Sequence, residues 1–104
     1  MNTQLDNVSI IKKSSIYFDG KCISHTILLP DGSKKTIGVI FVSSLTFTTG
    51  TPETMELVSG KCRVRLAGAT EWTNYEGGQQ FQVGANSHFD IETQETLDYV
   101  CHYG

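Results

Sequence analysis

Turn signals recur at intervals of about 8–12 residues along most of this chain, a rhythm typical of many short strands joined by turns. The signals are clusters of glycine with aspartate, serine, threonine or proline: Asp19-Gly20, Asp31-Gly32, Gly50-Thr51-Pro52, Ser59-Gly60, Gly68, Gly77-Gly78 and Gly84. We interpret Gly77-Gly78 as a hairpin turn, because no helix follows it that would make it a phosphate-binding loop.

Between the turns, apolar and polar residues alternate. Cys62, Val64 and Leu66 fall on one side of such a run, and Arg63 and Arg65 fall on the other. A period of two predicts half-buried antiparallel strands, and no window of eleven residues shows a helical stripe. Strands are expected near residues 8–18, 21–29, 35–41, 44–49, 53–59, 61–67, 72–76, 80–83, 87–92 and 97–103. The expected fold class is therefore all-β, as a barrel or a sandwich.

The length of 104 residues predicts one domain. Residues 1–14 are expected to form an N-terminal arm, partly frayed over the polar residues 1–7 or added as an edge strand, and residues 15–104 the barrel domain. A domain of this size buries a core but is only marginally stable alone, so a partner subunit would stabilise it.

The charge pattern excludes several classes of partner. The net charge is −3, and the paired lysines at 12–13 and 34–35 form no basic stripe of the kind that binds nucleic acid. The longest apolar runs are too short to span a bilayer, and the first residues lack the features of a secretory signal. We therefore expect a cytoplasmic protein that binds neither nucleic acid nor membrane.

Cys22, Cys62 and Cys101 are odd in number and lie far apart in the sequence. They form no Cys-x-x-Cys pair, so the sequence suggests neither a disulfide framework nor a zinc ribbon. Each sits among apolar strand residues, which favours buried reduced thiols that pack as small hydrophobic groups.

The segment 47–60 resembles the first motif of the cupin superfamily, in which two histidines, a glutamate and a glycine build a metal site inside a small β-barrel. Glu53 and Gly60 keep the spacing of that motif, but Phe47 and Thr49 stand where the histidines would be. In the region of the second motif, Phe89 stands where the third histidine would be. The resemblance therefore implies a cupin barrel whose metal ligands are missing.

Residues 17–104 resemble more closely the small single-domain cupins of the pyrimidine/purine nucleoside phosphorylase family. The resemblance rests on a series of short motifs in order: Tyr17-Phe18-x-Gly20-Lys21, Gly38-Val39-Ile40, Phe47-Thr48-Thr49, Pro52-Glu53-x-Met55, Val58-Ser59-Gly60, Trp72-x-x-Tyr75-Glu76-x-Gly78-x-x-Phe81-x-Val83, Ser87-x-Phe89 and Tyr99-x-Cys101-x-Tyr103. It departs from the family at Gly84, where a proline is often present.

This resemblance implies a jelly-roll β-barrel that forms a homodimer. It also implies a broad-specificity pentosyltransferase that cleaves purine and pyrimidine nucleosides with inorganic phosphate, giving free base and ribose 1-phosphate. No metal and no cofactor other than the phosphate co-substrate are expected.

Glu53 and Thr49 are the expected catalytic residues. A carboxylate facing the cavity can stabilise positive charge that develops on the sugar as the glycosidic bond breaks. Thr49 can donate a hydrogen bond to phosphate or to a sugar hydroxyl. The structural alternatives are a glutamate that accepts hydrogen bonds from the neighbouring turn and an ordinary strand threonine.

Other polar residues are candidates for holding the substrates. Lys34 and Thr36 follow the Asp31-Gly32 turn and are expected to contact an anion, since phosphate needs donors or a cation. Ser87 and His102 complete the expected polar contacts, and a histidine can protonate a departing base near neutral pH. A solvated turn and a surface histidine remain the structural alternatives, and Arg63 and Arg65 are expected to form a pair on the outer face.

Aromatic side chains provide the expected binding wall for a base, because every base has a π face that can stack on a ring. The candidates are Phe47, Phe89, Tyr99 and Tyr103, with Tyr75 as a further possibility. Trp72 is expected to pack at an interface or at the end of the barrel. The alternative functions are a non-catalytic cupin that binds a sugar or base, a metal-dependent cupin, and a structural interaction module.

Overall fold

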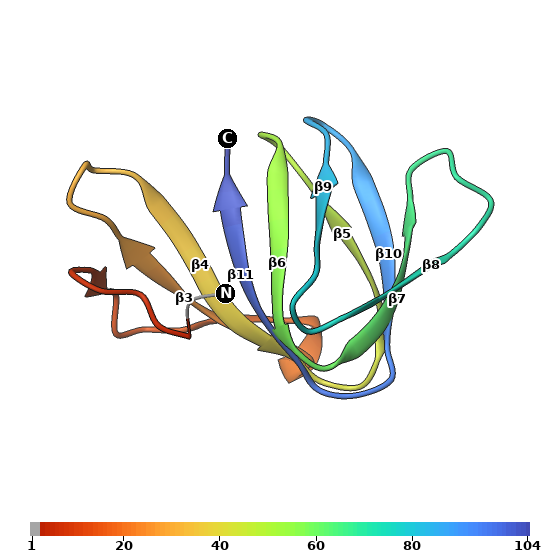
Figure 1. Cartoon of the computed structure of the whole chain (residues 1–104), viewed down its shortest axis with the longest axis horizontal. Helices are drawn as coiled ribbons and strands as arrows, with labels where there is room; N and C mark the ends of the chain where they lie inside the picture. Colours follow the sequence, from red (N-terminus) through yellow and green to blue (C-terminus); the bar gives the residue numbers. More distant parts are fainter. Residues whose placement is uncertain (1–2) are drawn as a thin grey trace.

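The computed structural model describes residues 3–104, and its regular secondary structure consists of short strands and one 3-10 turn (Figure 1). In chain order the elements are β1 (Ser9–Ile10), β2 (Ser15–Tyr17), the 3-10 turn η1 (Phe18–Gly20), β3 (Cys22–Leu28), β4 (Lys34–Ile40), β5 (Ser44–Thr48), β6 (Glu53–Ser59), β7 (Lys61–Leu66), β8 (Thr73–Glu76), β9 (Gln80–Val83), β10 (His88–Thr93) and β11 (Leu97–Tyr103). The all-β prediction is confirmed. The strand expected over 8–18 is instead two short strands, because the chain bends at residues 12–13.

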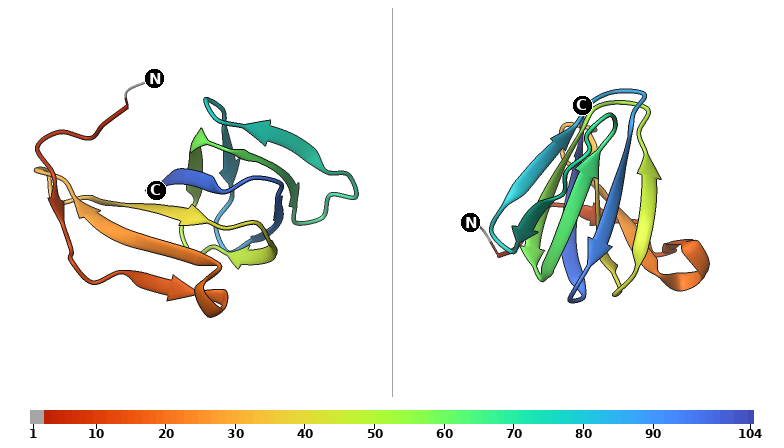
Figure 2. Two further views of the ribbon diagram at one scale, coloured as in Figure 1. Left: turned by 90° about the horizontal axis from the view of Figure 1, so that it is seen from below. Right: turned by 90° about the vertical axis from the view of Figure 1, so that its right-hand side faces the viewer.

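The strands form two antiparallel sheets that face each other (Figure 2). The larger sheet has the order β1-β3-β4-β11-β6-β9, with β2 also pairing with β3, and the smaller sheet has the order β5-β10-β7-β8. From β4 onward the chain crosses repeatedly from one sheet to the other, as in a jelly roll. The two sheets are not joined by hydrogen bonds into a closed barrel, because β5 is a free edge of the smaller sheet.

Two glycines allow the chain to cross closely between the sheets. Gly60 joins β6 to β7 with a φ of 103°, and a Cβ atom there would collide with the carbonyl oxygen of Thr96. Gly77 lies between β8 and β9, where a Cβ atom would meet the Cα atom of Ser59 at 2.8 Å. The prediction of a hairpin at Gly77-Gly78 is therefore wrong: β8 pairs with β7 and β9 pairs with β6, so this turn connects the two sheets.

The hydrophobic core lies between the sheets. Ile40, Leu57 and Leu97 from the larger sheet and Ile91 from the smaller one are fully buried, and the three cysteines are buried and free, as predicted. Within residues 3–104 no helix is long and apolar enough to cross a membrane.

Candidate functional site

A cavity of about 290 Å³ opens between the two sheets. The side chains and main chain that line it come from η1 and from strands of both sheets: Tyr17, Phe18, Ser24, Thr36, Thr46, Phe47, Thr48, Glu53, Met55, Phe89, Tyr99, Cys101 and Tyr103. This volume is close to the lower end of the roughly 300–1,000 Å³ range of small-molecule sites, and its apolar wall with a few polar groups is typical of them.

Strand alternation places the polar groups of the cavity on neighbouring strands. Tyr99, Cys101 and Tyr103 point inward from β11, which lies between β4 and β6. In the register of the larger sheet, Cys101 is opposite Thr36 on one side, and Tyr103 is opposite Glu53 on the other. Three strands thus bring a carboxyl, a thiol and two hydroxyl groups together.

Among residues 3–104, Glu53 is the only acidic residue that lines this cavity, and it lies at the start of β6. Its Oε1 atom accepts a hydrogen bond from the Cys101 Sγ at 3.4 Å. Partial burial raises the pKa of the Glu53 carboxyl above its ordinary value. The hydrogen bond from Cys101 offsets part of this rise. Burial, followed by the nearby Glu53, raises the pKa of the Cys101 thiol to about 12, so this cysteine remains a neutral donor.

The hydroxyl groups of Thr36 and Tyr103 lie 3.1 Å apart and form a hydrogen bond. Burial raises the pKa of Tyr103 to about 12, so the phenol stays protonated at neutral pH. The Nζ atom of Lys34 lies 5.9 Å from the centre of the Tyr103 ring, within range of a cation–π interaction. Lys34 shares the inward face of β4 with Thr36 and adds a positive charge beside the cavity, although it does not line it.

Aromatic rings form the wall contributed by the smaller sheet. Phe47 from β5 and Phe89 from β10 are direct cross-strand partners, and their rings stack with centroids 5.4 Å apart and an interplanar angle of 18°. Phe18 from η1 meets Phe47 edge to face at 5.2 Å. Phe18 also has a φ of 53°, a left-handed conformation that is uncommon for a bulky residue and stores strain of about 1–3 kcal/mol.

Four residues predicted for the site do not line this cavity: Lys34, which lies beside it, and Thr49, Ser87 and His102. Thr49 donates to the Gly84 carbonyl at 2.6 Å and accepts from the Ser87 N–H at 3.0 Å, so these two residues fasten the β9–β10 loop to the end of β5. His102 points to the opposite face of β11 from Cys101, and its Nε2 lies 2.8 Å from a carboxylate oxygen of Glu56. Alternation along the strand turns its ring away from the cavity.

The cavity also contains residues that sequence reasoning did not assign to it: Tyr17, Phe18, Ser24, Thr46, Thr48, Met55 and Cys101. A signal was present for two of them. Phe18 belongs to an aromatic pair beside the Asp19-Gly20 turn, and Cys101 alternates with Tyr99 and Tyr103. The Cys101 thiol was expected to be buried, and the sequence did not indicate its carboxyl partner, which comes from a distant strand.

The residues at the cupin metal positions do not fit a metal ion. Phe47 and Phe89 offer no donor atom, and their rings occupy this space by stacking on each other. The Thr49 hydroxyl is engaged by main-chain groups. Among residues 3–104, no cluster of three or more histidine, cysteine, aspartate or glutamate side chains is arranged to hold a metal.

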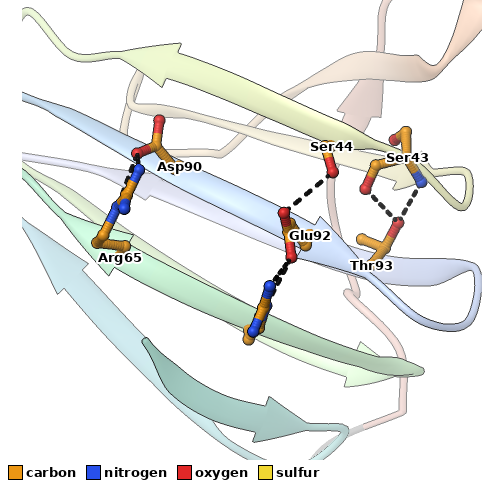
Figure 3. Close-up of polar contacts among 7 residues, drawn as sticks. Ser43, Ser44, Arg65, Asp90, Glu92 and Thr93 are labelled. Carbon is orange, nitrogen blue, oxygen red and sulfur yellow. Dashed lines mark hydrogen bonds and ion pairs between the residues drawn. The ribbon is translucent and has the colours of Figure 1, made fainter. Parts of the chain in front are cut away.

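The outer face of the smaller sheet carries a ladder of ion pairs, seen in Figure 3. Arg65 pairs with Asp90 at 2.9 Å, and the Arg63 Nε donates to Glu92 at 2.6 Å. Both guanidinium groups lie over the Trp72 ring, with their central carbons 4.8 and 4.5 Å from its centre. The prediction that the two arginines form an outer-face pair is confirmed, and Trp72 packs on them at the surface.

Comparisons with known proteins agree on one family. The sequence model described as pyrimidine/purine nucleoside phosphorylase matches residues 12–103. A protein of that name from Herminiimonas arsenicoxydans is 71% identical over 99% of both chains, and one from Janthinobacterium sp. (strain Marseille) is 70% identical over the same shares. A relative of the same name from Cupriavidus necator is 64% identical over 97% of this chain and 96% of its own.

Solved structures agree with the fold. A protein of unknown function from Acinetobacter sp. ADP1 is similar with a TM-score of 0.95 and 54% identity, over 97% of this chain and 98% of the other. The EutQ protein of Clostridium difficile has a TM-score of 0.65 at 8% identity, over 77% of this chain and 64% of its own. Ectoine synthase from P. lautus has a TM-score of 0.66 at 14% identity, over 78% of this chain and 62% of its own. These last two show the fold alone, and that fold is the expected cupin.

Proposed function

This chain belongs to the pyrimidine/purine nucleoside phosphorylase family, and we propose that its nucleoside phosphorolysis takes place in the cavity between the two sheets. In this reaction the C1′–N bond of the nucleoside breaks, a C1′–O bond to phosphate forms, and the bonding electrons leave with the base. The observation that carries the proposal is that one cavity brings a partly desolvated carboxylate, two neutral hydroxyl groups and a pair of stacked rings within reach of one small ligand.

Glu53 faces the sugar in this proposal. Its carboxylate stabilises the positive charge that develops on the ribose as the bond to the base lengthens, and the partly desolvated site strengthens this interaction. Cys101 fixes the carboxylate by donating to its Oε1 atom. Glu53 is therefore the proposed catalytic residue, and Cys101 is a positioning residue.

The phosphate is proposed to lie at the Thr36–Tyr103 side of the cavity. In the Thr36–Tyr103 hydrogen bond one hydroxyl donates to the other, which leaves the proton of the second free to donate to a phosphate oxygen. Lys34 above the Tyr103 ring supplies a positive charge. The Phe47 ring on the smaller sheet offers an apolar surface to the base, and the buried Phe89 ring supports it by stacking on it. A surface of this kind discriminates weakly between bases, which supports broad specificity for purine and pyrimidine nucleosides.

The mechanism is proposed to need no metal and no cofactor besides phosphate. Positioning of the two substrates and charge stabilisation by Glu53 supply the rate enhancement. Dialysis against a strong chelator should leave the rate of base release unchanged, with elemental analysis of the dialysed protein as the check. Loss of activity that returns on adding a divalent metal would contradict this part of the proposal.

A turnover assay with the Glu53→Gln variant tests the role of the carboxylate. Uridine, inosine and adenosine are each mixed with phosphate, and release of free base is followed with and without the anion. Wild-type protein should release base only with phosphate, and Glu53→Gln should lower kcat by about 100-fold or more, as the loss of a charge-stabilising group typically does. Absence of base release by folded wild-type protein with every nucleoside would favour a binding cupin without catalysis.

Glu56→Gln is the matched control, since Glu56 lies on the same strand but on the opposite face, paired with His102. Its rate should stay within about twofold of wild type, as expected for a side chain that does not touch the substrate.

Because burial raises the Glu53 pKa, the ionised carboxylate destabilises the fold at pH values above that pKa. The Glu53→Gln variant should therefore melt no lower than wild type at pH 8, and an equal rate in both variants would make Glu53 part of the scaffold.

We also propose that the protein forms a homodimer through the outer face of its larger sheet. Ile16, Ile23 and Val39 form one cross-strand row on this face, and Ile16 is 63% exposed. Exposed apolar rows of this kind are typical of interfaces. Ile16→Lys should shift the molar mass measured by light scattering from dimer to monomer, whereas Val42→Lys, at an exposed position in the β4–β5 connection, should not.

The remaining parts of the proposal concern location and other partners. A cytoplasmic location is supported by three free cysteines, because unpaired thiols are typical of reducing compartments. Absence of nucleic-acid binding is supported by the net charge of −3 and by the pairing of both arginines with acidic neighbours. We also propose that the protein does not bind membranes, because its longest apolar runs are too short to span a bilayer.

A further inference from the structure

The open edge of β5 is the main-chain feature of the cavity that the proposed mechanism does not use. β5 is the terminal strand of the smaller sheet and pairs only with β10 within the described part of the chain. Figure 2 shows β5 at the side of this sheet that faces the turn η1. The other edge of β5 therefore carries main-chain N–H and C=O groups that have no strand partner.

The hydrogen bonds between β5 and β10 show which residues of β5 present these groups at the open edge. The Thr49 N–H donates to the Ser87 carbonyl at 2.9 Å, and the Thr93 N–H donates to the Ser43 carbonyl at 3.0 Å. In an antiparallel pair, residues that bond to the partner strand alternate with residues whose main-chain groups point away from it. The main-chain N–H and C=O groups of the odd-numbered residues in this segment thus point to β10. Those of Ser44, Thr46 and Thr48 point to the open edge.

Two of these three residues line the cavity. Thr46 and Thr48 are lining residues, whereas Ser44 is not. The Thr46 side chain points to the outer face, where its Oγ1 donates to Asp90 at 2.7 Å. Thr48 is two positions along the strand, so its side chain points to the same outer face. What these residues offer to the cavity is therefore a row of main-chain donors and acceptors.

Aromatic rings flank this row. The Phe47 side chain points inward between Thr46 and Thr48, and the Phe18 ring meets it edge to face. Phe18 is held there by a turn in which it, Asp19 and Gly20 all have positive φ values, of 53°, 54° and 90°. A planar ligand that packs on these rings has its edge close to the main chain of β5.

We propose that the open edge of β5 is the base subsite, in which the main-chain N–H and C=O groups of Thr46 and Thr48 hydrogen-bond to the edge of the nucleobase while Phe18 and Phe47 pack against it. This inference rests on the proposed function and adds the recognition of the substrate. Main-chain groups supply donors and acceptors together, and purines and pyrimidines both present donors and acceptors on their edges. The same strand edge therefore accepts both classes of base, which side chains of fixed polarity would not do.

Proline substitution tests this proposal because it removes one main-chain donor. Thr48→Pro deletes the N–H that points to the open edge, a position where an edge strand tolerates proline. Ser44→Pro is the matched control, since it deletes an N–H of the same phase outside the cavity. Thr48→Pro should raise KM for uridine and for inosine about tenfold each, with kcat within about threefold, as expected for a lost binding hydrogen bond. Ser44→Pro should leave both constants unchanged.

A second measurement does not depend on folding of the variants. Wild-type protein is assayed with 3-methyluridine, in which a methyl group replaces the N3 proton on the base edge. The KM for this nucleoside should exceed that for uridine at least about tenfold. Equal KM values for the two nucleosides, or equal KM values for Thr48→Pro and Ser44→Pro, would overturn the base subsite and leave the proposed phosphorolysis in place.

Calorimetry separates failure of this inference from failure of the proposed function. Uracil and hypoxanthine are titrated into wild-type protein and into both proline variants. If wild-type protein shows no turnover but binds both bases, and Thr48→Pro alone loses them, the subsite stands and the proposed function fails. Absence of binding of either base to wild-type protein would overturn the subsite.

Discussion

The packed core and the cavity are built from the same strands but follow different rules. On β11, Leu97 is fully buried in the core, whereas Tyr103 at the other end of the strand is 39% exposed at the cavity. On β4, Ile40 is fully buried and Thr36 lines the cavity. The core is filled with aliphatic side chains that gain from leaving water, and the cavity keeps polar groups whose burial costs stability. The first region therefore holds the fold together, and the second is available for chemistry.

Leu97→Ala should give the largest effect on stability and little change in chemistry. Removing a fully buried leucine side chain leaves a void between the sheets, and such changes cost about 2–5 kcal/mol of unfolding free energy. Urea denaturation measures this loss, and the rate of base release per folded molecule should stay close to wild type. A loss of rate at retained stability would mean that the two regions are not independent.

Tyr103→Phe should give the opposite pattern. The change removes the hydroxyl that bonds to Thr36 but keeps the ring, so unfolding free energy should fall by no more than about 1 kcal/mol. Loss of a donor to phosphate should lower kcat/KM for phosphate about tenfold. Tyr75→Phe is the control, because Tyr75 packs on Phe81 away from the cavity and its change should leave kcat/KM unaltered. Equal kinetics in the two variants would remove Tyr103 from the phosphate site.

Cys101→Ala should shift the pH dependence of the reaction. The Cys101 hydrogen bond lowers the pKa of Glu53, so its removal should raise that pKa. Activity that needs the carboxylate falls as pH drops through this pKa, and the acid limb of the kcat profile should therefore move to higher pH. Cys101→Ser keeps a donor and should restore the wild-type limb. An acid limb that is the same in Cys101→Ala and wild type would show that the thiol has only a packing role.

The ion pairs on the outer face should contribute least. Arg63 and Glu92 are both partly exposed, so solvent screens their interaction. A double-mutant cycle with alanine at both positions should give a coupling energy of about 0.2–1 kcal/mol that falls with added salt. A much larger value would show that this ladder stabilises the sheet as strongly as core packing does.

The all-β fold was predictable because its signals are local. Turn residues and strand alternation fixed nearly every strand from 21 onward, and the strand at 53–59 matches β6 to the residue. The prediction of a hairpin at Gly77-Gly78 was wrong because a turn signal does not indicate which sheet the next strand joins. The expected fraying over residues 1–7 includes residues 1 and 2, which lie outside the described residues.

The candidate site was predictable only in part. Glu53, Phe47, Phe89, Tyr99, Tyr103 and Thr36 meet in one cavity, whereas Lys34 lies beside it and Thr49, Ser87 and His102 lie outside it. For His102, the alternation of β11 with Cys101 and Tyr103 already indicated the opposite face. For Thr49 and Ser87, the contact that engages them joins segments 38 residues apart, and no local pattern indicates such a contact.

The sequence by itself determined the class of fold, the strand faces, the free thiols and the family, because each of these depends on residue type and short-range spacing. Only the tertiary structure decided that Glu53 meets Cys101 and that Thr36 meets Tyr103, since these pairs lie 48 and 67 residues apart. The open edge of β5 likewise exists only because β10 pairs with one side of that strand and no strand within residues 3–104 pairs with the other. Strand order and register arise from packing two sheets around one core, and they are properties of the whole chain rather than of any segment.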